Sequence, residues 1–223
     1  MNSSFTESTL RAYESWAPSY APVAHNPLMR SEERAMLELW PDVSGRRILD
    51  LACGTGRYSR LLAETGAADI TAVDFCPPML DRVALRRRVC ADMMHLPFAN
   101  AAFDAVISGL AIGHAPDVHA WMAEIARVIG DGGALLYSDF HPEAARAGLP
   151  RTFKDADNRT ITVPHRSYSV DMQRQAAEAA RLTIESCREI RVGIELKETF
   201  SNSDEFYRRW HGLPIVLIVK AGK

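Results

Sequence analysis

Short apolar runs of strand length recur between residues 46 and 140, and more polar stretches separate them. Five such runs are present, at 46–52, 69–73, 89–91, 103–107 and 134–137. Apolar runs of this length that are bounded by turn residues are typical of buried β-strands. They predict the strands of a central sheet.

The stretches between these runs carry helical signals. Residues 55–64 include a cluster of apolar positions, and Pro77-Pro78 opens a second helix because proline is tolerated in a first helical turn. Asp117 is a suitable N-cap, and the apolar positions after it recur at spacings of three and four. The glycine-rich run 130–133 is expected to stop that helix. Alternation of strands and helices predicts an α/β fold with a mostly parallel sheet and helices on both faces.

Both flanks follow other patterns. Residues 1–44 contain two helical patterns, and Asn26-Pro27 caps the second, so we expect a helical cap there. Residues 150–166 predict a small β-hairpin insertion with its turn at 155–158.

The rest of the chain completes the predicted sheet. A helix is expected at 170–182, and strands at 183–190 and 215–219 bring the Rossmann-like sheet to seven strands. We expect a single domain over residues 1–223. Its parts are a cap (1–44), a core (45–140), and an insertion with the last strands (141–223).

The amino-acid composition limits the classes of binding partner that we expect. The chain has 223 residues and a formal charge of −2. A near-neutral chain without a basic stripe gives no reason to expect nucleic acid or an acidic membrane as partner, and the run 86–88 is interpreted as a solvated helix end. The composition leaves open whether the protein is a monomer or a homodimer.

Cysteine usage and the N-terminus bear on location and on metals. Cys53, Cys76, Cys90 and Cys187 form no CxxC pair and accompany no histidine cluster, so no metal site is expected. Scattered cysteines fit a reducing compartment. The first ten residues lack the apolar segment of a signal peptide, and no run of about 18 apolar residues exists. We therefore expect a cytoplasmic protein.

The strongest chemical signal is a glycine-rich turn between the first strand and its helix. Asp50 lies near the end of that strand, and Ala52, Gly54 and Gly56 follow it. Glycines let a ligand approach the main chain, and the following helix N-terminus favours an anionic group. The Asp50 carboxylate suits a cationic group of the same ligand, although it could instead cap the helix.

Two more acids end the next two strands. Asp74 stands where an acidic side chain accepts hydrogen bonds from ribose hydroxyls. Asp92 can meet an adenine amino group, while Met79 and Met93 offer apolar cover for the ring. The alternatives are an ordinary turn acid for Asp74 and a loop residue for Asp92. Their arrangement in order along the chain favours a nucleoside ligand.

Five ordered segments resemble the class I S-adenosylmethionine (SAM)-dependent methyltransferases, above all the group that includes the ubiquinone, menaquinone and biotin-pathway enzymes. They are ILDLACGTGRYSRLL, ITAVDFCPPML, CADMMHLPF, FDAVISGLAIGH and RVIGDGGALLYSDF. SAM carries an α-carboxylate, which suits the helix N-terminus, and an α-ammonium, which suits the Asp50 carboxylate. The resemblance covers about residues 46–140. It departs at Ala52, where the family often has glycine.

The resemblance implies a role for each matching residue. The glycine loop and Asp50 would hold the methionine part of SAM, Asp74 the ribose, and Asp92 with Met93 the adenine. Leu110 matches the position that often meets the sulfonium end. The other expected cofactor contacts are Phe75 beside Asp74, and Tyr20 and Arg30 in the cap, which closes over SAM in related enzymes.

The acceptor is expected to be a small molecule with an oxygen, nitrogen or carboxylate nucleophile. His114, just past the fourth strand, is the candidate general base, because histidine titrates near neutral pH; it could instead only shape the pocket. His25, His141 and His165 are weaker candidates, and Tyr13 belongs to the cap. Phe200, Phe206, Tyr207 and Trp210 are interpreted first as helix core and second as a wall of the acceptor site.

Two other functions share part of this pattern. A NAD-dependent oxidoreductase has the same strand, glycine loop and helix, but Ser59 stands where a third glycine or alanine is expected. A non-catalytic SAM-binding or regulatory module would keep every cofactor segment and lack only the base. Binding tests with SAM and NAD, and turnover of labelled SAM, separate these alternatives.

Overall fold

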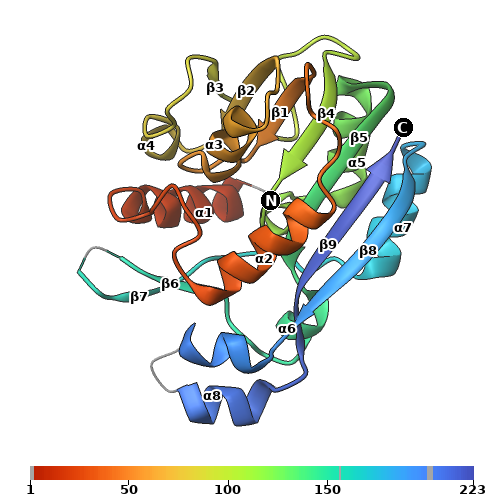
Figure 1. The fold of residues 1–223 in the computed structure, drawn as a ribbon. Helices are drawn as coiled ribbons and strands as arrows, with labels where there is room; N and C mark the ends of the chain where they lie inside the picture. Colours follow the sequence, from red (N-terminus) through yellow and green to blue (C-terminus); the bar gives the residue numbers. More distant parts are fainter. Residues whose placement is uncertain (1–2, 156, 200–202) are drawn as a thin grey trace.

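A computed structural model describes residues 3–155, 157–199 and 203–223. Its centre is a seven-stranded sheet with the order β3-β2-β1-β4-β5-β9-β8 (Figure 1). The strands are β1 (Arg47–Leu51), β2 (Asp69–Asp74), β3 (Arg88–Cys90), β4 (Phe103–Ser108), β5 (Ile129–Phe140), β8 (Thr183–Arg191) and β9 (Pro214–Gly222). The first five run parallel, and β9 is antiparallel to both β5 and β8. The predicted Rossmann-like sheet is confirmed.

Helices cover both faces of this sheet because its strands are apolar on both sides. The helices are α1 (Ser3–Trp16), α2 (Pro27–Glu38), α3 (Arg57–Glu64), α4 (Pro77–Leu80), α5 (Val118–Val128), α6 (Pro142–Arg146), α7 (Val170–Ala179) and α8 (Ser203–Trp210). Ile48 of β1 packs with Met36 and Leu62, from α2 and α3. Leu49, one residue later, belongs to a second cluster with Trp121 of α5. Alternate residues of one strand therefore anchor opposite helical layers.

The predicted hairpin forms its own small sheet of β6 (Thr152–Lys154) and β7 (Thr160–Thr162). Figure 1 shows this hairpin and α1 on the same side of the molecule, beyond the carboxyl ends of the parallel strands. The two predicted helices of the cap are α1 and α2. Asn26 caps α2 through a 2.9 Å bond from the Met29 amide to its side-chain oxygen, as expected.

Two predicted boundaries were wrong. The helix expected from residue 55 begins at Arg57, because Gly56 before it adopts a left-handed conformation with φ of 88°. The glycine run 130–133 does not separate a helix from a strand, since α5 ends at Val128 and β5 begins at Ile129. The register between β4 and β5 shifts near Phe103, and this irregularity lets the glycines form part of strand β5.

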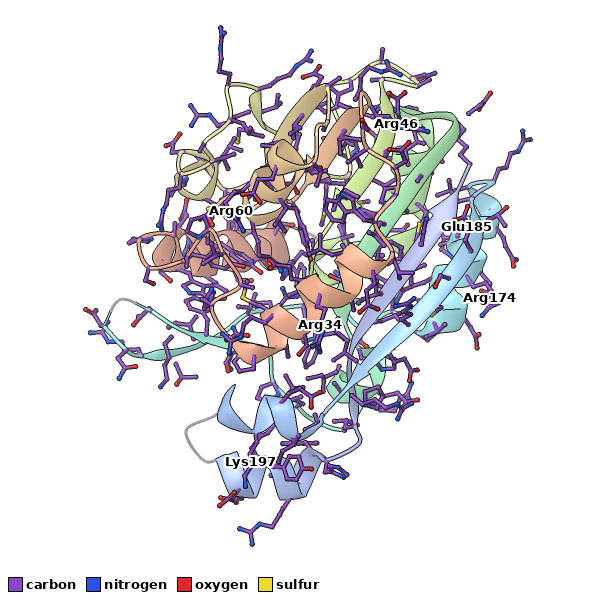
Figure 2. All side chains as sticks on the ribbon, in the orientation of Figure 1. Arg34, Arg46, Arg60, Arg174, Glu185 and Lys197 are labelled. Atoms are coloured by element: carbon purple, nitrogen blue, oxygen red, sulfur yellow. The ribbon has the colours of Figure 1, made fainter. Side chains whose placement is uncertain are left out.

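The edge strand β8 carries charged residues that discourage further strand pairing. Glu185, labelled on this strand in Figure 2, is exposed, and Arg188 pairs with Glu38 at 2.6 Å across to α2. In the described ranges, no helix is both long enough and apolar enough to cross a membrane.

Candidate active site

A cavity of about 810 Å³ lies at the carboxyl edge of the parallel strands. Its wall combines residues from the loops after β1, β2, β3 and β4 with residues from α1 and from the β6–β7 hairpin. Ligands in open α/β folds bind at this edge. The cavity is therefore the candidate active site, and its size is that of an ordinary small-molecule pocket.

Asp74 closes the glycine loop at one end of the cavity. Its Oδ2 accepts a 2.7 Å hydrogen bond from the Gly54 amide, and its Oδ1 accepts one of 2.8 Å from the Cys76 amide. Burial raises the pKa of Asp74 above its usual value, and the backbone donors partly oppose that rise. The carboxylate is thus fixed at the cavity wall, where its remaining lone pairs can accept hydrogen bonds from hydroxyl groups.

The loop before it has an unusual backbone. Ala52 adopts φ of 54°, and Gly54 adopts φ of 56°. A left-handed conformation is strained for alanine and free for glycine, so a glycine at position 52 would remove this strain. Both residues line the cavity with their backbone exposed to a ligand.

Asp50 lies behind the loop rather than in the described cavity wall. Its Oδ2 accepts a 2.6 Å hydrogen bond from the Ser59 hydroxyl in the first turn of α3. Its Oδ1 makes no hydrogen bond to any described residue, and burial raises the pKa of Asp50 to about 6. This bond ties β1 to the first turn of α3, and the expected contact of Asp50 with a ligand stays a prediction.

The structure brings most of the other expected cofactor residues to the cavity. These are Tyr20, Ala52, Gly54, Asp74, Phe75, Met79, Asp92, Met93 and Leu110. Phe75 is 40% exposed although it is a large apolar ring, so it offers a free face at the wall. Arg30 and Gly56 fall outside the described wall: Arg30 is exposed on α2, and Gly56 caps α3.

His114 also lines the cavity, and it contacts the cap. Its Nε2 is 2.9 Å from the hydroxyl of Tyr13, which α1 contributes. Burial lowers the pKa of His114 well below its usual value, so the imidazole is neutral at physiological pH. Burial also raises the pKa of Tyr13, which therefore keeps its proton. In the tautomer that carries its proton on Nδ1, the neutral histidine accepts this hydrogen bond at Nε2 from the tyrosine hydroxyl.

Arg151 completes this polar cluster. It stands just before β6 and donates from Nη2 to the Leu110 carbonyl oxygen at 2.6 Å and to the Tyr13 hydroxyl oxygen at 3.3 Å. Its Nη1 is 3.7 Å from Asp139 Oδ1 at the end of β5. The sequence patterns did not single out Arg151, because the hairpin brings it to the cavity from a position distant in the chain.

The weaker candidates occupy different places. His25 lines the cavity, whereas His141 is buried 3.4 Å from Glu189 and His165 stands at the edge of the Phe140 ring. Tyr207 and Trp210 pack against the core beneath α8, as expected of helix core, and Phe206 does so while also lining the cavity. Phe200 lies outside the described residues.

A buried ion pair was also missed. Arg57 lines the cavity directly after the glycine loop, and its Nη1 is 2.7 Å from Glu32 Oε2 on α2. Glu32 also accepts hydrogen bonds from the Tyr58 and Ser138 hydroxyls. The sequence does contain one sign of this ion pair. Glu32 lies on the apolar face of its helix, because Met29 and Met36 stand three residues before it and four residues after it.

The fold and this glycine loop define the class I SAM-dependent methyltransferase architecture. A crystal structure of an S-adenosylmethionine dependent methyltransferase from Mesorhizobium loti superposes with a TM-score of 0.69 and 24% identity, covering 86% of this chain and 98% of that one. Residues 49–137 match the family model described as a methyltransferase domain. The chain therefore shares the Rossmann-like methyltransferase fold, and its residues 49–137 are similar to a methyltransferase domain.

Two curated relatives extend the similarity. A malonyl-[acyl-carrier protein] O-methyltransferase of Halorhodospira halophila is 38% identical over 143 residues, which is 60% of this chain and 48% of the relative. A demethylmenaquinone methyltransferase of Corynebacterium urealyticum is 41% identical over 116 residues, 51% of this chain and 48% of that protein. The chain thus spans about half the length of these relatives.

Proposed function

We propose that this protein transfers the methyl group of SAM to an oxygen, nitrogen or carboxylate nucleophile of a small-molecule acceptor. The observation that carries the proposal is one cavity whose wall contains both the glycine loop with Asp74 and the Tyr13–His114–Arg151 cluster. The methyltransferase domain match over residues 49–137 supports it.

The chemistry of the cavity wall fits SAM. Asp74 offers carboxylate oxygens for ribose hydroxyls, and Phe75 and Met79 offer apolar surface for adenine. Arg57 places a charged guanidinium at the wall beside the glycine loop, where it suits the α-carboxylate. The bound cofactor would supply a methyl group that is already electrophilic.

The residues of this chain then have two tasks. The cap and the hairpin cover the cavity, which positions the acceptor and excludes water; alignment of this kind contributes roughly 7–11 kcal/mol to lowering a barrier. An acceptor that must lose a proton would give it to the Tyr13–His114 pair. The Tyr13 hydroxyl passes its own proton to His114 Nε2, 2.9 Å away, and takes the acceptor's proton in exchange.

Cofactor binding tests the first half of the proposal. Isothermal titration calorimetry with S-adenosylhomocysteine should show binding to the native protein and none with NAD. Asp74→Asn should weaken binding at least tenfold, because the side chain loses its charge at the ribose site. Asp69→Asn is the matched control, since this acid lies at the start of the same strand, is 40% exposed and pairs with Arg87. Equal binding by both variants would contradict the assignment.

Turnover tests the second half. With methyl-labelled SAM and a panel of small metabolites, transfer to at least one acceptor is expected. For an acceptor that loses a proton, Tyr13→Phe and His114→Asn should each lower kcat by about 10²–10⁴-fold with little change in cofactor affinity. Cofactor binding without turnover on any acceptor would favour a non-catalytic SAM-binding module.

A further inference from the structure

Arg151 is a cation held inside the cavity with unused hydrogen-bonding capacity. Its side chain is only 16% exposed, yet Nη1 has no hydrogen-bond partner among the described residues. The nearest carboxylate oxygen, Asp139 Oδ1, is 3.7 Å away, beyond hydrogen-bond distance, and it also lacks a partner in the described chain. A buried donor without a partner is costly, so such a group is expected to have one in the working complex.

Asp139 balances this cation only partly. It is absent from the described cavity wall, whereas Arg151 is part of it. Burial raises the pKa of Asp139 to about 6, although Arg151 opposes the rise. Asp139 therefore orients the guanidinium from behind and leaves the cavity side of the cluster electropositive. The histidines nearby, His114 and His165, are neutral because burial lowers the pKa of each.

The position of Arg151 relative to the reacting end makes its charge informative. Its Nη2 donates to the carbonyl of Leu110, the residue that matches the sulfonium end in the resembling family. A sulfonium and a guanidinium are both cations, and they repel in a pocket of low dielectric. An anionic atom between them removes this repulsion.

We propose that the methyl acceptor presents an anionic oxygen, from a carboxylate or from an ionised enol or phenol, to the Arg151 guanidinium. The inference rests on the proposed function and names the acceptor class for the same site. The apolar body of the acceptor would lie along the apolar lining that α1 and the hairpin give the cavity, which includes Leu10, Trp16, Phe153 and Val163.

The reaction then balances without an added reagent. A lone pair of the anionic oxygen forms the new bond to the methyl carbon, the carbon–sulfur bond breaks, and its electron pair stays on sulfur. The products are a neutral methyl ester or ether and neutral S-adenosylhomocysteine. A carboxylate reaches the site ionised and needs no base, whereas an enol or phenol first gives its proton to the Tyr13–His114 pair.

Matched acids and amides test the charge requirement. Straight-chain and aryl monocarboxylates of four to ten carbons, each with its primary amide, are titrated by calorimetry into protein saturated with S-adenosylhomocysteine. At least one acid should bind ten times more tightly than its amide. Arg151→Gln should reduce that preference to threefold or less, and Arg151→Lys should retain part of it. Arg159→Gln is the control, because Arg159 is exposed on the same hairpin and lies outside the described wall.

The outcomes separate the two proposals. S-adenosylhomocysteine should bind all four proteins within about threefold, and loss of that binding in the native protein would overturn the proposed function itself. If the cofactor product binds but no acid exceeds its amide tenfold, or if the preference survives in Arg151→Gln, the anionic-acceptor inference is wrong. A turnover series with methyl-labelled SAM and unsubstituted phenols, whose pKa of about 10 keeps them protonated at pH 7, separates the sources, since only phenol methylation should also require His114.

Discussion

Replacing Glu32 with glutamine removes one charge from a buried cluster that joins the cap to the sheet. The Glu32 side chain is fully buried, and it pairs at 2.7 Å with Arg57, whose side chain is 8% exposed. Glutamine keeps the shape and can still accept from the Tyr58 and Ser138 hydroxyls. The substitution therefore isolates the loss of the charge.

The expected cost follows from what remains around Arg57. Breaking a buried ion pair by removing one partner costs about 3–5 kcal/mol, because the other charge stays buried without compensation. Glu33 is 3.5 Å from the same Nη1 and 20% exposed, so it offsets part of the loss. We expect the free energy of unfolding to fall by about 3 kcal/mol, at the lower end of that range. For a chain of this size the melting temperature should fall by roughly 6–12 °C.

Urea denaturation followed by circular dichroism measures this effect. Glu38→Gln is the control on the same helix, because its pair with Arg188 is exposed at both ends and should contribute at most about 1 kcal/mol. A Glu32→Gln/Arg57→Met double variant should recover part of the lost stability, since it removes the uncompensated charge. If Glu32→Gln costs no more than Glu38→Gln, the cluster does not anchor the cap as argued.

Three further outcomes are expected. Gly56→Ala should lower the free energy of unfolding by about 1–2 kcal/mol in denaturant titrations, because the backbone φ at this position is 88°. Gly130→Ala is the control and should cost less, because Gly130 has an ordinary φ and a Cβ added there would meet no atom closer than 3.6 Å. The pKa of Asp139 is about 6 in the folded protein and near 4 in the unfolded chain, so between these pH values the folded protein holds a proton that unfolding releases. The free energy of unfolding therefore falls as the pH rises from 4 to 6. Asp139→Asn should reduce that fall by at most about 3 kcal/mol, and an unchanged slope would refute the pKa shift. Phe153→Leu removes a ring stacked at 4.0 Å on the cap helix, so it should raise the KM for the acceptor and leave S-adenosylhomocysteine affinity within twofold; the reverse would place this ring at the cofactor.

Local patterns predicted the sheet and the meeting of Asp74 with the glycine loop in one cavity wall. Asp74 and Gly54 converge because parallel strands bring their carboxyl ends to one edge, and that placement follows from sequence order. Asp50 shows the limit of this reasoning. It also stands near a strand end, but its side chain meets Ser59 beneath the loop instead of the cavity.

The Tyr13–His114–Arg151 cluster could not be predicted in the same way. The contact of Tyr13 with His114 spans 101 positions in the chain, and that of Arg151 with Tyr13 spans 138. Such contacts depend on how the cap and the hairpin pack, and no local period encodes that packing. Arg30 was expected to contact the ligand because it lies in the cap, but it is exposed on α2 and lies outside the described cavity wall.

The two helices of the cap are fastened by different forces. The buried Glu32 side chain binds α2 to α3 through Arg57 and to β5 through Ser138, whereas ring contacts such as Trp16 on Phe153 hold α1 to the hairpin. Losing a ring stack costs about 0.5–1.5 kcal/mol beyond the area that it buries, whereas breaking a buried ion pair costs about 3–5 kcal/mol. We therefore expect acceptors to enter and methylated products to leave between α1 and the hairpin. Several rounds of acceptor exchange could then take place around a cofactor pocket that stays assembled.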